Sequence, residues 1–357
     1  MTLEVVALKR VTLLAGFLTF GLALAASATL TGAGATFPYP LYAKYFSVYH
    51  QLTGVRVNYQ SIGSGGGVRQ LFAQTVHFGA SDAPLSDAKI AEFKERFQTD
   101  VIHVPTALGA VAVVYHLPGV EKPLRFSGEV LGRIFLGAIR RWDDPQIAAE
   151  NPGVKLPPLP ITVVHRSDGS GTTYIFTEYL SKVSSDWKAR VGFGKSVGWP
   201  TGLGGKGNEG VAGLVRQIPG AIGYAELIYA LQNKIPFAAV QNRAGHFILP
   251  SLESVQSAAK LEDFPRDTRV SLTDTSAPDG YPISGFTWIL VYQDMAKNRA
   301  FKNRAQAEAL AKLLWWIVHD GQEYNEPLHY ARLPEVVVRI TEENLKRLSY
   351  KGEPLLR

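Results

Sequence analysis

Three glycine-rich loops are the segments of this chain whose residue types could bind an anion. They cover residues 31–38 (TGAGATFP), 61–68 (SIGSGGGV) and 166–172 (RSDGSGT), each between an extended and a helical stretch. A helix start leaves backbone N–H groups without partners, and glycine lets an anion approach that backbone closely. Hydroxyl donors in these loops come from Thr36, Ser64, Ser170 and Thr172. The loops therefore predict a site for a tetrahedral oxyanion, the alternative being that these residues only cap helices and form turns.

Charged residues near these loops would decide which oxyanion binds. Arg166 has a planar guanidinium suited to phosphate oxygens, and Asp168 could hold it in place or serve as a turn residue. Asp82, in the segment GASDAPLS, has the wrong sign for an anion site. Its carboxylate could accept a hydrogen bond from protonated phosphate and reject sulfate, which has no proton to donate. The alternative is that Asp82 caps a helix that begins near Pro84.

Two nucleotide-binding patterns are absent from the glycine-rich segments. The dinucleotide fingerprint would need glycine where the chain has Phe37 and Val68. Residues 202–208 (GLGGKGN) fail as a P-loop because Pro200 and Gly207 stand where Gly and then Ser or Thr are required. This stretch is therefore predicted to be a turn packed near a domain surface.

No catalytic centre or metal site is expected. The eight histidines show neither H-x-x-x-H nor H-E-x-x-H spacing, and His165 beside Arg166 reads as a structural strand residue. Asp82 and Ser64 could be drawn as a nucleophile pair, but they lack a base and a group to orient it. An exported phosphatase remains the alternative enzyme class. A surface adhesion module is a third class, but the chain has no repeats or anchor to support it.

Strands alternating with helices must position the loops. Extended stretches are expected at 55–59, 107–115, 161–165 and 286–292, and helices at 40–51, 68–74, 172–182, 306–318 and 335–348. The continuous apolar run at 107–115 is typical of a strand covered on both faces. The pattern predicts an α/β architecture with mostly parallel sheets.

The N-terminus reads as a targeting segment. Lys9 and Arg10 precede 16 apolar residues, 11–26, and a small-x-small sequence ends at Ala28. This order is typical of a secretory signal peptide, and the apolar stretch is shorter than the ~20 residues of a membrane-spanning helix. We therefore expect residues 1–28 to be a signal peptide cleaved near Ala28, a membrane anchor being the alternative.

Composition limits the remaining possibilities. The chain has 357 residues, 46% of them hydrophobic and 19% charged, which suits two globular domains with packed cores. A net charge of +6 without basic runs fits an anionic partner but not nucleic acid. The chain contains no cysteine, which excludes disulfides, thiolate metal sites and a lipid-modified N-terminal cysteine.

Long stretches of the chain resemble the PstS family, the periplasmic phosphate-binding proteins of phosphate ABC importers. They are TGAGATFPYPLYAKY (31–45), NYQSIGSGGGVRQ (58–70), FGASDAPLS (78–86), HRSDGSGTTYIFT (165–177) and GWPTGLGGKGNEGVAG (198–213). The resemblance runs over essentially the whole chain after residue 28. It implies a two-lobed periplasmic-binding-protein (type II) fold with two crossover strands and a ligand cleft between the lobes.

The resemblance also implies site residues. The family's phosphate contacts fall on Thr36, Phe37 (through its N–H), Ser64, Asp82, Arg166, Ser170, Gly171 and Thr172. The counterpart of Asp82 accepts the phosphate proton in this family, and the counterpart of Asp168 pairs with the arginine. Residues next to Ser64 and Arg166 vary in the family, and here they are Gly65 and Ser167.

The implied function is phosphate capture by hinge closure and delivery to the membrane permease subunits of an ABC importer. Lobe I would comprise residues 29–105 and 283–357, and lobe II residues 106–282. The resemblance implies a periplasmic, monomeric, non-enzymatic protein without a cofactor.

Overall fold

The computed structural model describes residues 28–261 and 263–356, so the predicted signal peptide lies outside the described residues apart from Ala28. Up to the first long strand the elements are β1 (Thr29–Gly34), α1 (Tyr39–Thr53), β2 (Arg56–Ser61), α2 (Ser64–Phe72), β3 (Phe78–Ser81), α3 (Asp87–Phe97) and β4 (Val101–Tyr115). The middle of the chain forms β5 (Arg125–Phe126), α4 (Gly128–Phe135), α5 (Pro145–Glu150), β6 (Thr162–Arg166), α6 (Gly171–Val183), α7 (Ser185–Arg190), β7 (Leu203–Gly205), α8 (Gly207–Gln217), β8 (Ala221–Glu226), α9 (Leu227–Gln232), β9 (Ala239–Gln241), β10 (Phe247–Ile248) and α10 (Leu252–Ala258). The last part forms β11 (Ser284–Tyr292), α11 (Arg304–Val318), α12 (Glu335–Lys346), β12 (Ser349–Tyr350) and β13 (Glu353–Pro354), with three short 3₁₀ turns at Met295–Lys297, Asp320–Tyr324 and Glu326–Leu328.

One eight-stranded sheet runs through the molecule in the order β2-β1-β3-β11-β4-β8-β6-β7. Its outer strands are parallel: β1 with β2 and β3, and β6 with β7 and β8. Its centre is antiparallel, because β11 runs against both β3 and β4, and β4 runs against β8. The sheet is therefore mixed, and the expectation of mostly parallel sheets was wrong at the centre. The α/β class was predicted correctly.

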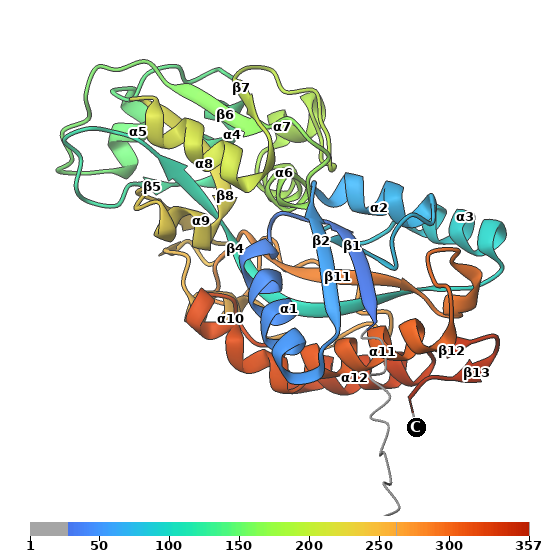
Figure 1. The fold of residues 1–357 in the computed structure, drawn as a ribbon. Coiled ribbons are helices and arrows are strands. Elements are labelled where there is room, and N and C mark those ends of the chain that lie inside the picture. Colours follow the sequence, from blue (N-terminus) through green and yellow to red (C-terminus); the bar gives the residue numbers. More distant parts are fainter. Residues whose placement is uncertain (1–27, 262, 357) are drawn as a thin grey trace, which may run out of the picture.

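Two lobes lie on either side of this centre (Figure 1). Lobe I contains β1, β2, β3 and β11, and lobe II contains β6, β7 and β8. The strand β4 serves both: Val101–Ala110 pairs with β11, and Val111–Tyr115 pairs with β8. The chain returns beside it, since Val111 N–H donates to Ile283 O at 2.8 Å just before β11 begins. These are the two crossover segments of the predicted fold.

Burial explains why the apolar run became a strand inside the molecule. All 15 residues of β4 and all nine of β11 are buried, as expected for strands with both faces covered.

The helix α1 begins and ends with residues that favour helix termini. A proline occupies its first turn, and Gly54 ends it at φ 76° in the left-handed region. Within the described ranges, no helix has the length and apolar content of a membrane span.

Candidate anion-binding site

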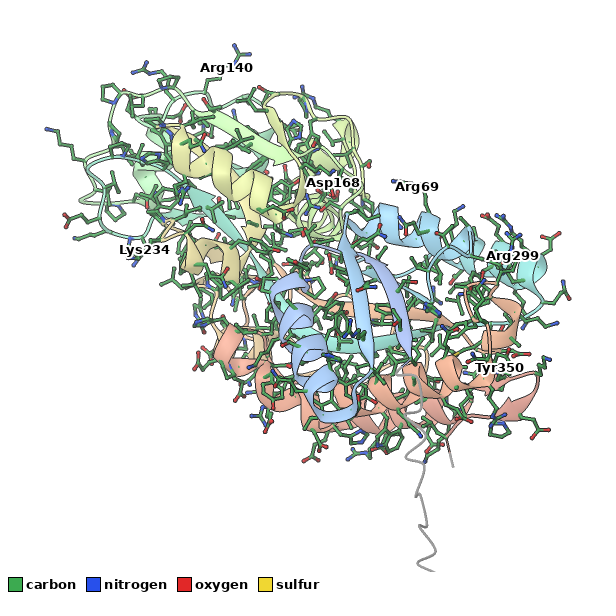
Figure 2. The ribbon with its side chains drawn as sticks, in the orientation of Figure 1. Arg69, Arg140, Asp168, Lys234, Arg299 and Tyr350 are labelled. Carbon is green, nitrogen blue, oxygen red and sulfur yellow. The ribbon has the colours of Figure 1, made fainter. Side chains whose placement is uncertain are left out.

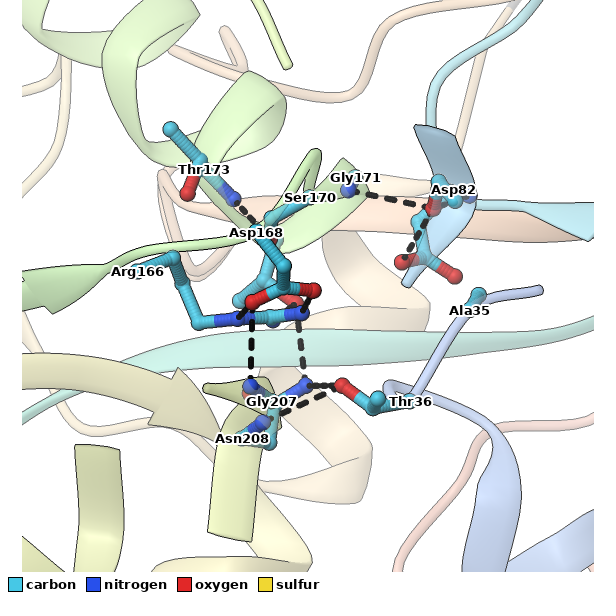
Figure 3. A network of polar contacts seen from close by, with 12 residues as sticks. Ala35, Thr36, Asp82, Arg166, Asp168, Ser170, Gly171, Thr173, Gly207 and Asn208 are labelled. Carbon is cyan, nitrogen blue, oxygen red and sulfur yellow. Dashed lines mark hydrogen bonds and ion pairs between the residues drawn. The ribbon is translucent and has the colours of Figure 1, made fainter. Parts of the chain in front are cut away.

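The predicted loops meet at the carboxyl ends of the parallel strands. In lobe I, Thr36 follows β1, Ser64 follows β2 and Asp82 follows β3; in lobe II, residues 166–172 lead from β6 into α6. In open α/β sheets, loops at this edge form the ligand crevice. Because the strands of the two lobes end towards each other, segments far apart in the chain, such as those of Thr36 and Arg166, face one another across one region (Figure 3).

Arg166 is buried at the end of β6 and is held by Asp168. Its Nε donates to Asp168 Oδ1 at 2.8 Å and its Nη2 donates to Oδ2 at 2.6 Å, a two-pronged ion pair. Burial acts to raise the pKa of Asp168, but the hydrogen bonds and charge of Arg166 outweigh it and hold that pKa below its ordinary value. Asp168 also accepts from Gly207 N–H at 3.0 Å. The guanidinium therefore has a fixed orientation and a permanent counter-charge.

Ser64 joins the two lobes. Its Oγ accepts hydrogen bonds from Asp82 N–H at 3.2 Å within lobe I and from Gly171 N–H at 3.1 Å in lobe II. Both lone pairs of the hydroxyl are thereby used, and its proton is donated to Asp82 Oδ2 at 3.4 Å. At Gly171 an added Cβ would lie 2.6 Å from both the Ser64 hydroxyl oxygen and Asp82 Cβ, so this contact between lobes requires glycine.

Asp82 is a carboxylate in an unusually dry place. Only 2% of its surface is exposed, and Thr287 on β11 donates to its Oδ1 at 2.7 Å. Burial raises the pKa of Asp82 to about 7, although the hydrogen bond from Thr287 and the charge of Arg166 act in the opposite direction. The helix α3 starts five residues later and is capped by Ser86. The alternative that Asp82 caps this helix is therefore wrong.

A buried asparagine connects the remaining hydroxyls. Asn208, at the start of α8, donates to Thr36 Oγ1 through its N–H at 3.1 Å and through Nδ2 at 2.8 Å. The same Nδ2 donates to Thr172 Oγ1 at 3.1 Å, and Arg166 Nη1 reaches that oxygen at 3.3 Å. Asn208 Oδ1 accepts from Glu226 N–H at 2.9 Å, which fixes the orientation of the amide.

These contacts determine which way the hydroxyl protons point. A threonine hydroxyl has two lone pairs and one proton. Thr36 Oγ1 and Thr172 Oγ1 each accept two N–H bonds, so each must direct its proton to a further acceptor. Both hydroxyl protons are therefore available to an acceptor in the region between the lobes.

The other predicted residues lie in the same region with different local roles. Ser170 caps α6 by accepting from Thr173 N–H at 2.9 Å, so the helix-cap alternative holds for its oxygen. Phe37 is buried, and Tyr330 Oη donates to its carbonyl at 2.6 Å. Over residues 28–261 and 263–356, no protein acceptor is found for the N–H groups of Thr36 and Phe37. Two buried donors at the start of α1 are thus available to an anion.

Residues 202–208 correct one sequence prediction. Gly202 to Gly204 are exposed, but Gly207 and Asn208 are buried and contact Asp168, Thr36 and Thr172. The stretch is a fourth strand–glycine–helix loop and not only a surface turn. The sequence could have predicted this loop, because residues 204–210 (GGKGNEG) have the same order of extended residues, glycine and helix as the other three loops. Thr287 was also missed, since a buried strand residue carries no such signal.

The described part of the chain contains no cluster of three or more His, Asp or Glu side chains placed to hold a metal ion. His165 stacks on Trp199 with ring centroids 4.7 Å apart, and its Nδ1 lies 3.0 Å from the Arg166 carbonyl. This packing agrees with the structural role expected for it.

Comparison with known proteins identifies the family. Residues 23–320 match the model of the PBP superfamily domain. A phosphate-binding protein PstS of Pasteurella multocida is 46% identical over 93% of this chain and 94% of its own length. The PstS protein of Xylella fastidiosa strain 9a5c is 44% identical over 88% of this chain and 84% of its own. The PstS protein of Methanocaldococcus jannaschii is 37% identical over 86% of this chain and 83% of its own length.

Solved structures support the fold. A high-affinity periplasmic phosphate-binding protein, PfluDING, bound with phosphate, superposes with a TM-score of 0.69, covering 92% of this chain and all of its own at 21% identity. A phosphate-binding protein of Stenotrophomonas maltophilia superposes with a TM-score of 0.68, covering 89% of this chain and 94% of its own at 17% identity. The chain belongs to the PBP superfamily and, within it, to the PstS family of phosphate-binding proteins.

Proposed function

We propose that this protein captures one inorganic phosphate ion between its lobes and delivers it to an ABC import permease. The observation that carries the proposal is the convergence of donors on one buried region. Arg166, the hydroxyls of Thr36 and Thr172, and the N–H groups of Thr36 and Phe37 lie there together with the acceptor carboxylate of Asp82. A tetrahedral oxyanion satisfies such donors at once.

Neutral donors, not net charge, would hold the ion. Asp168 already balances the charge of Arg166, with an Nη2–Oδ2 distance of 2.6 Å. The remaining stabilisation comes from hydroxyl and backbone dipoles fixed by Ser64, Asn208 and the helix starts. Fixed dipoles in a dry site stabilise an anion without reorganising when it binds.

Asp82 supplies selectivity for phosphate over sulfate. Thr287 donates to Oδ1, and Oδ2 accepts a hydrogen bond of 3.4 Å from Ser64 Oγ, so Oδ2 keeps a lone pair that can accept a hydrogen bond from a protonated ligand oxygen. Monohydrogen phosphate has such a proton, whereas sulfate would place two acceptors against each other in a buried site. The eight phosphate contacts predicted from the family resemblance, Thr36, Phe37, Ser64, Asp82, Arg166, Ser170, Gly171 and Thr172, are the residues proposed to touch the ion, with Asp168 orienting the arginine.

Closure of the lobes would enclose the ion. We assign residues 29–105 and 283–357 to lobe I and 106–282 to lobe II, with the hinge where Val111 meets Ile283. Contacts between the lobes support this: Gly65 N–H donates to Gly169 O at 2.8 Å, and Tyr229 Oη donates to Thr36 O at 2.6 Å. Such bonds form and break as two lobes rotate about paired strands.

Family membership supports the proposed partner. We infer that the protein hands its ligand to a membrane permease, and we place it in the periplasm as a monomer after removal of residues 1–28. The relatives are named as phosphate-binding proteins and not as hydrolases.

Titration of the mature protein with phosphate, sulfate and arsenate by calorimetry tests the proposal. One phosphate per chain with at least ~100-fold weaker sulfate binding is the expected result. Absence of phosphate binding would overturn it. Hydrolysis of a phosphate ester by the same sample, lost in the Arg166→Ala variant, would favour the phosphatase alternative.

A further inference from the structure

Two pockets lie beside the candidate site, and they differ in charge. One, of about 610 Å³, is lined by Asp82, Asp87, Glu178 and Arg269 among others, so carboxylates outnumber cations. The other, of about 500 Å³, lies along the seam where α2 of lobe I meets the loop before α6 of lobe II. Its charged residues are Arg69, Lys89, Arg96, Lys195 and Glu92, a formal charge of +3. We call this second groove the seam pocket.

The seam pocket ends directly on the site's own loops. Gly65 and Gly169 line it, and these residues adjoin Ser64 and Ser170. The Gly65 N–H donates to Gly169 O at 2.8 Å, and a Cβ on Gly65 would lie 3.1 Å from Gly169 Cα. The backbones of Gly65 and Gly169 are thus in contact, and this contact lies between the seam pocket and the site residues Ser64 and Ser170. Opening of the lobes at this seam would connect the two.

The cations of the seam pocket come from both lobes and are mostly free. Arg69, Lys89 and Arg96 are exposed on α2 and α3, and half-buried Lys195 belongs to lobe II. Glu92 pairs with Lys89 at 2.6 Å. Among residues 28–261 and 263–356, no carboxylate lies within 4.0 Å of Arg69, Arg96 or Lys195. Figure 2 shows Arg69 at the border between the lobes near Asp168.

We propose that the seam pocket is the encounter site through which phosphate enters, its unpaired cations attracting the anion to the Gly65–Gly169 seam. This inference rests on the proposed function. The physical reason is that a cleft lined by one sign of charge concentrates an oppositely charged ligand and raises its association rate by 10- to 1,000-fold. The acidic groove beside Asp82 would instead repel a phosphate dianion. Entry is therefore assigned to one groove and not the other.

Association kinetics test the assignment. Rapid mixing with phosphate, followed by tryptophan fluorescence, gives the association and dissociation rates at NaCl concentrations from 20 to 500 mM. The wild-type association rate is expected to fall as salt rises, because exposed charges are screened beyond a few ångströms at high ionic strength. An association rate that does not fall with salt overturns the proposal even before any variant is made.

Two matched variants locate the effect. Arg69→Gln, Arg96→Gln and Lys195→Gln together should lower the association rate about tenfold at low salt, flatten its salt dependence and leave the dissociation rate nearly unchanged. The control removes the same charge at exposed residues remote from the seam, with Lys122→Gln, Arg140→Gln and Lys155→Gln; Figure 2 shows Arg140 at the far end of lobe II. It should change the association rate less than twofold.

The outcomes separate the two proposals. If the wild-type protein binds no phosphate, the proposed function fails. If it binds phosphate and the seam variant associates as fast as the control, the encounter site fails while the function stands. If the seam variant has an unchanged association rate but cells that carry it lose phosphate uptake, these cations dock a permease, and the proposal is likewise overturned.

Discussion

Asn208 holds the hydroxyl oxygen of Thr36 with two hydrogen bonds, one from its backbone N–H and one from its side-chain amide. The two residues come from different lobes and lie 172 positions apart in the chain. The contact orients a donor and ties the lobes together at the same time.

Replacing Asn208 with alanine should weaken phosphate binding, because the Thr36 and Thr172 hydroxyls would each lose the side-chain amide bond that helps to orient them as donors, while the backbone N–H bond to Thr36 and the Arg166 bond to Thr172 remain. We expect a loss of about 1–3 kcal/mol, the usual effect of breaking a buried hydrogen-bond set. In a Thr36→Val background the same substitution should cost less, since the hydroxyl that it orients is gone. Calorimetry on the four proteins measures this coupling. Strictly additive losses would show that Asn208 acts independently of Thr36.

Replacing Asp82 with asparagine should reduce the preference for phosphate over sulfate. An amide can donate to sulfate where the carboxylate only accepts, so sulfate affinity should rise relative to phosphate affinity. Competition calorimetry with both anions gives the ratio. Asp87→Asn is the control, because Asp87 lines the same groove, pairs with Arg269 at 2.8 Å and does not contact the proposed ion. An unchanged ratio in Asp82→Asn would remove the selectivity role.

The pKa of Asp82 also predicts how stability depends on pH. The folded protein holds this carboxyl's pKa at about 7, whereas its ordinary value is 3.8. Between about pH 4 and pH 7 the unfolded chain loses this proton while the folded protein keeps it. The contribution of Asp82 to stability therefore falls as pH rises through that window and is constant above it, by about 1.4 kcal/mol per unit of raised pKa as an upper limit.

Urea unfolding of phosphate-free protein at pH 4.5 and pH 8 measures the effect. Asp82→Asn cannot ionise, so its free energy of unfolding relative to wild type should be higher at pH 8 than at pH 4.5. Equal differences at the two pH values would mean that Asp82 does not titrate in this range.

Gly171→Ala should prevent close contact between the lobes. The new methyl group would meet Ser64 and Asp82 at 2.6 Å, and the closed arrangement would have to open to accept it. Phosphate affinity should fall at least about tenfold, corresponding to about 1.4 kcal/mol. Gly213→Ala in α8 is the matched control, since no atom lies within 4 Å of its added Cβ. Small-angle scattering with phosphate should show a larger radius of gyration for Gly171→Ala only.

The sequence was sufficient to predict the loops but not the residues that support them. Glycine, hydroxyls and a following helix are local features, so the segments around Thr36, Ser64 and Arg166 could together be predicted as anion-binding loops. Asn208 acts through contacts with two distant segments, and from the sequence alone an asparagine at this position could equally be a turn residue. The antiparallel centre of the sheet was missed for a similar reason. The direction of β4 against β11 and β8 is set by the path of long connections, which periodicity does not record.

The Arg166–Asp168 pair affects more than the geometry of the site. A transport protein must load, release and reload its cargo many times. A buried cation that relied on the cargo for its counter-charge would be left uncompensated at every release, at a cost of several kcal/mol. Here the compensating carboxylate belongs to the same loop, two residues away, and is anchored by Gly207. Loading and unloading can therefore proceed without a step in which an uncompensated buried charge destabilises the fold.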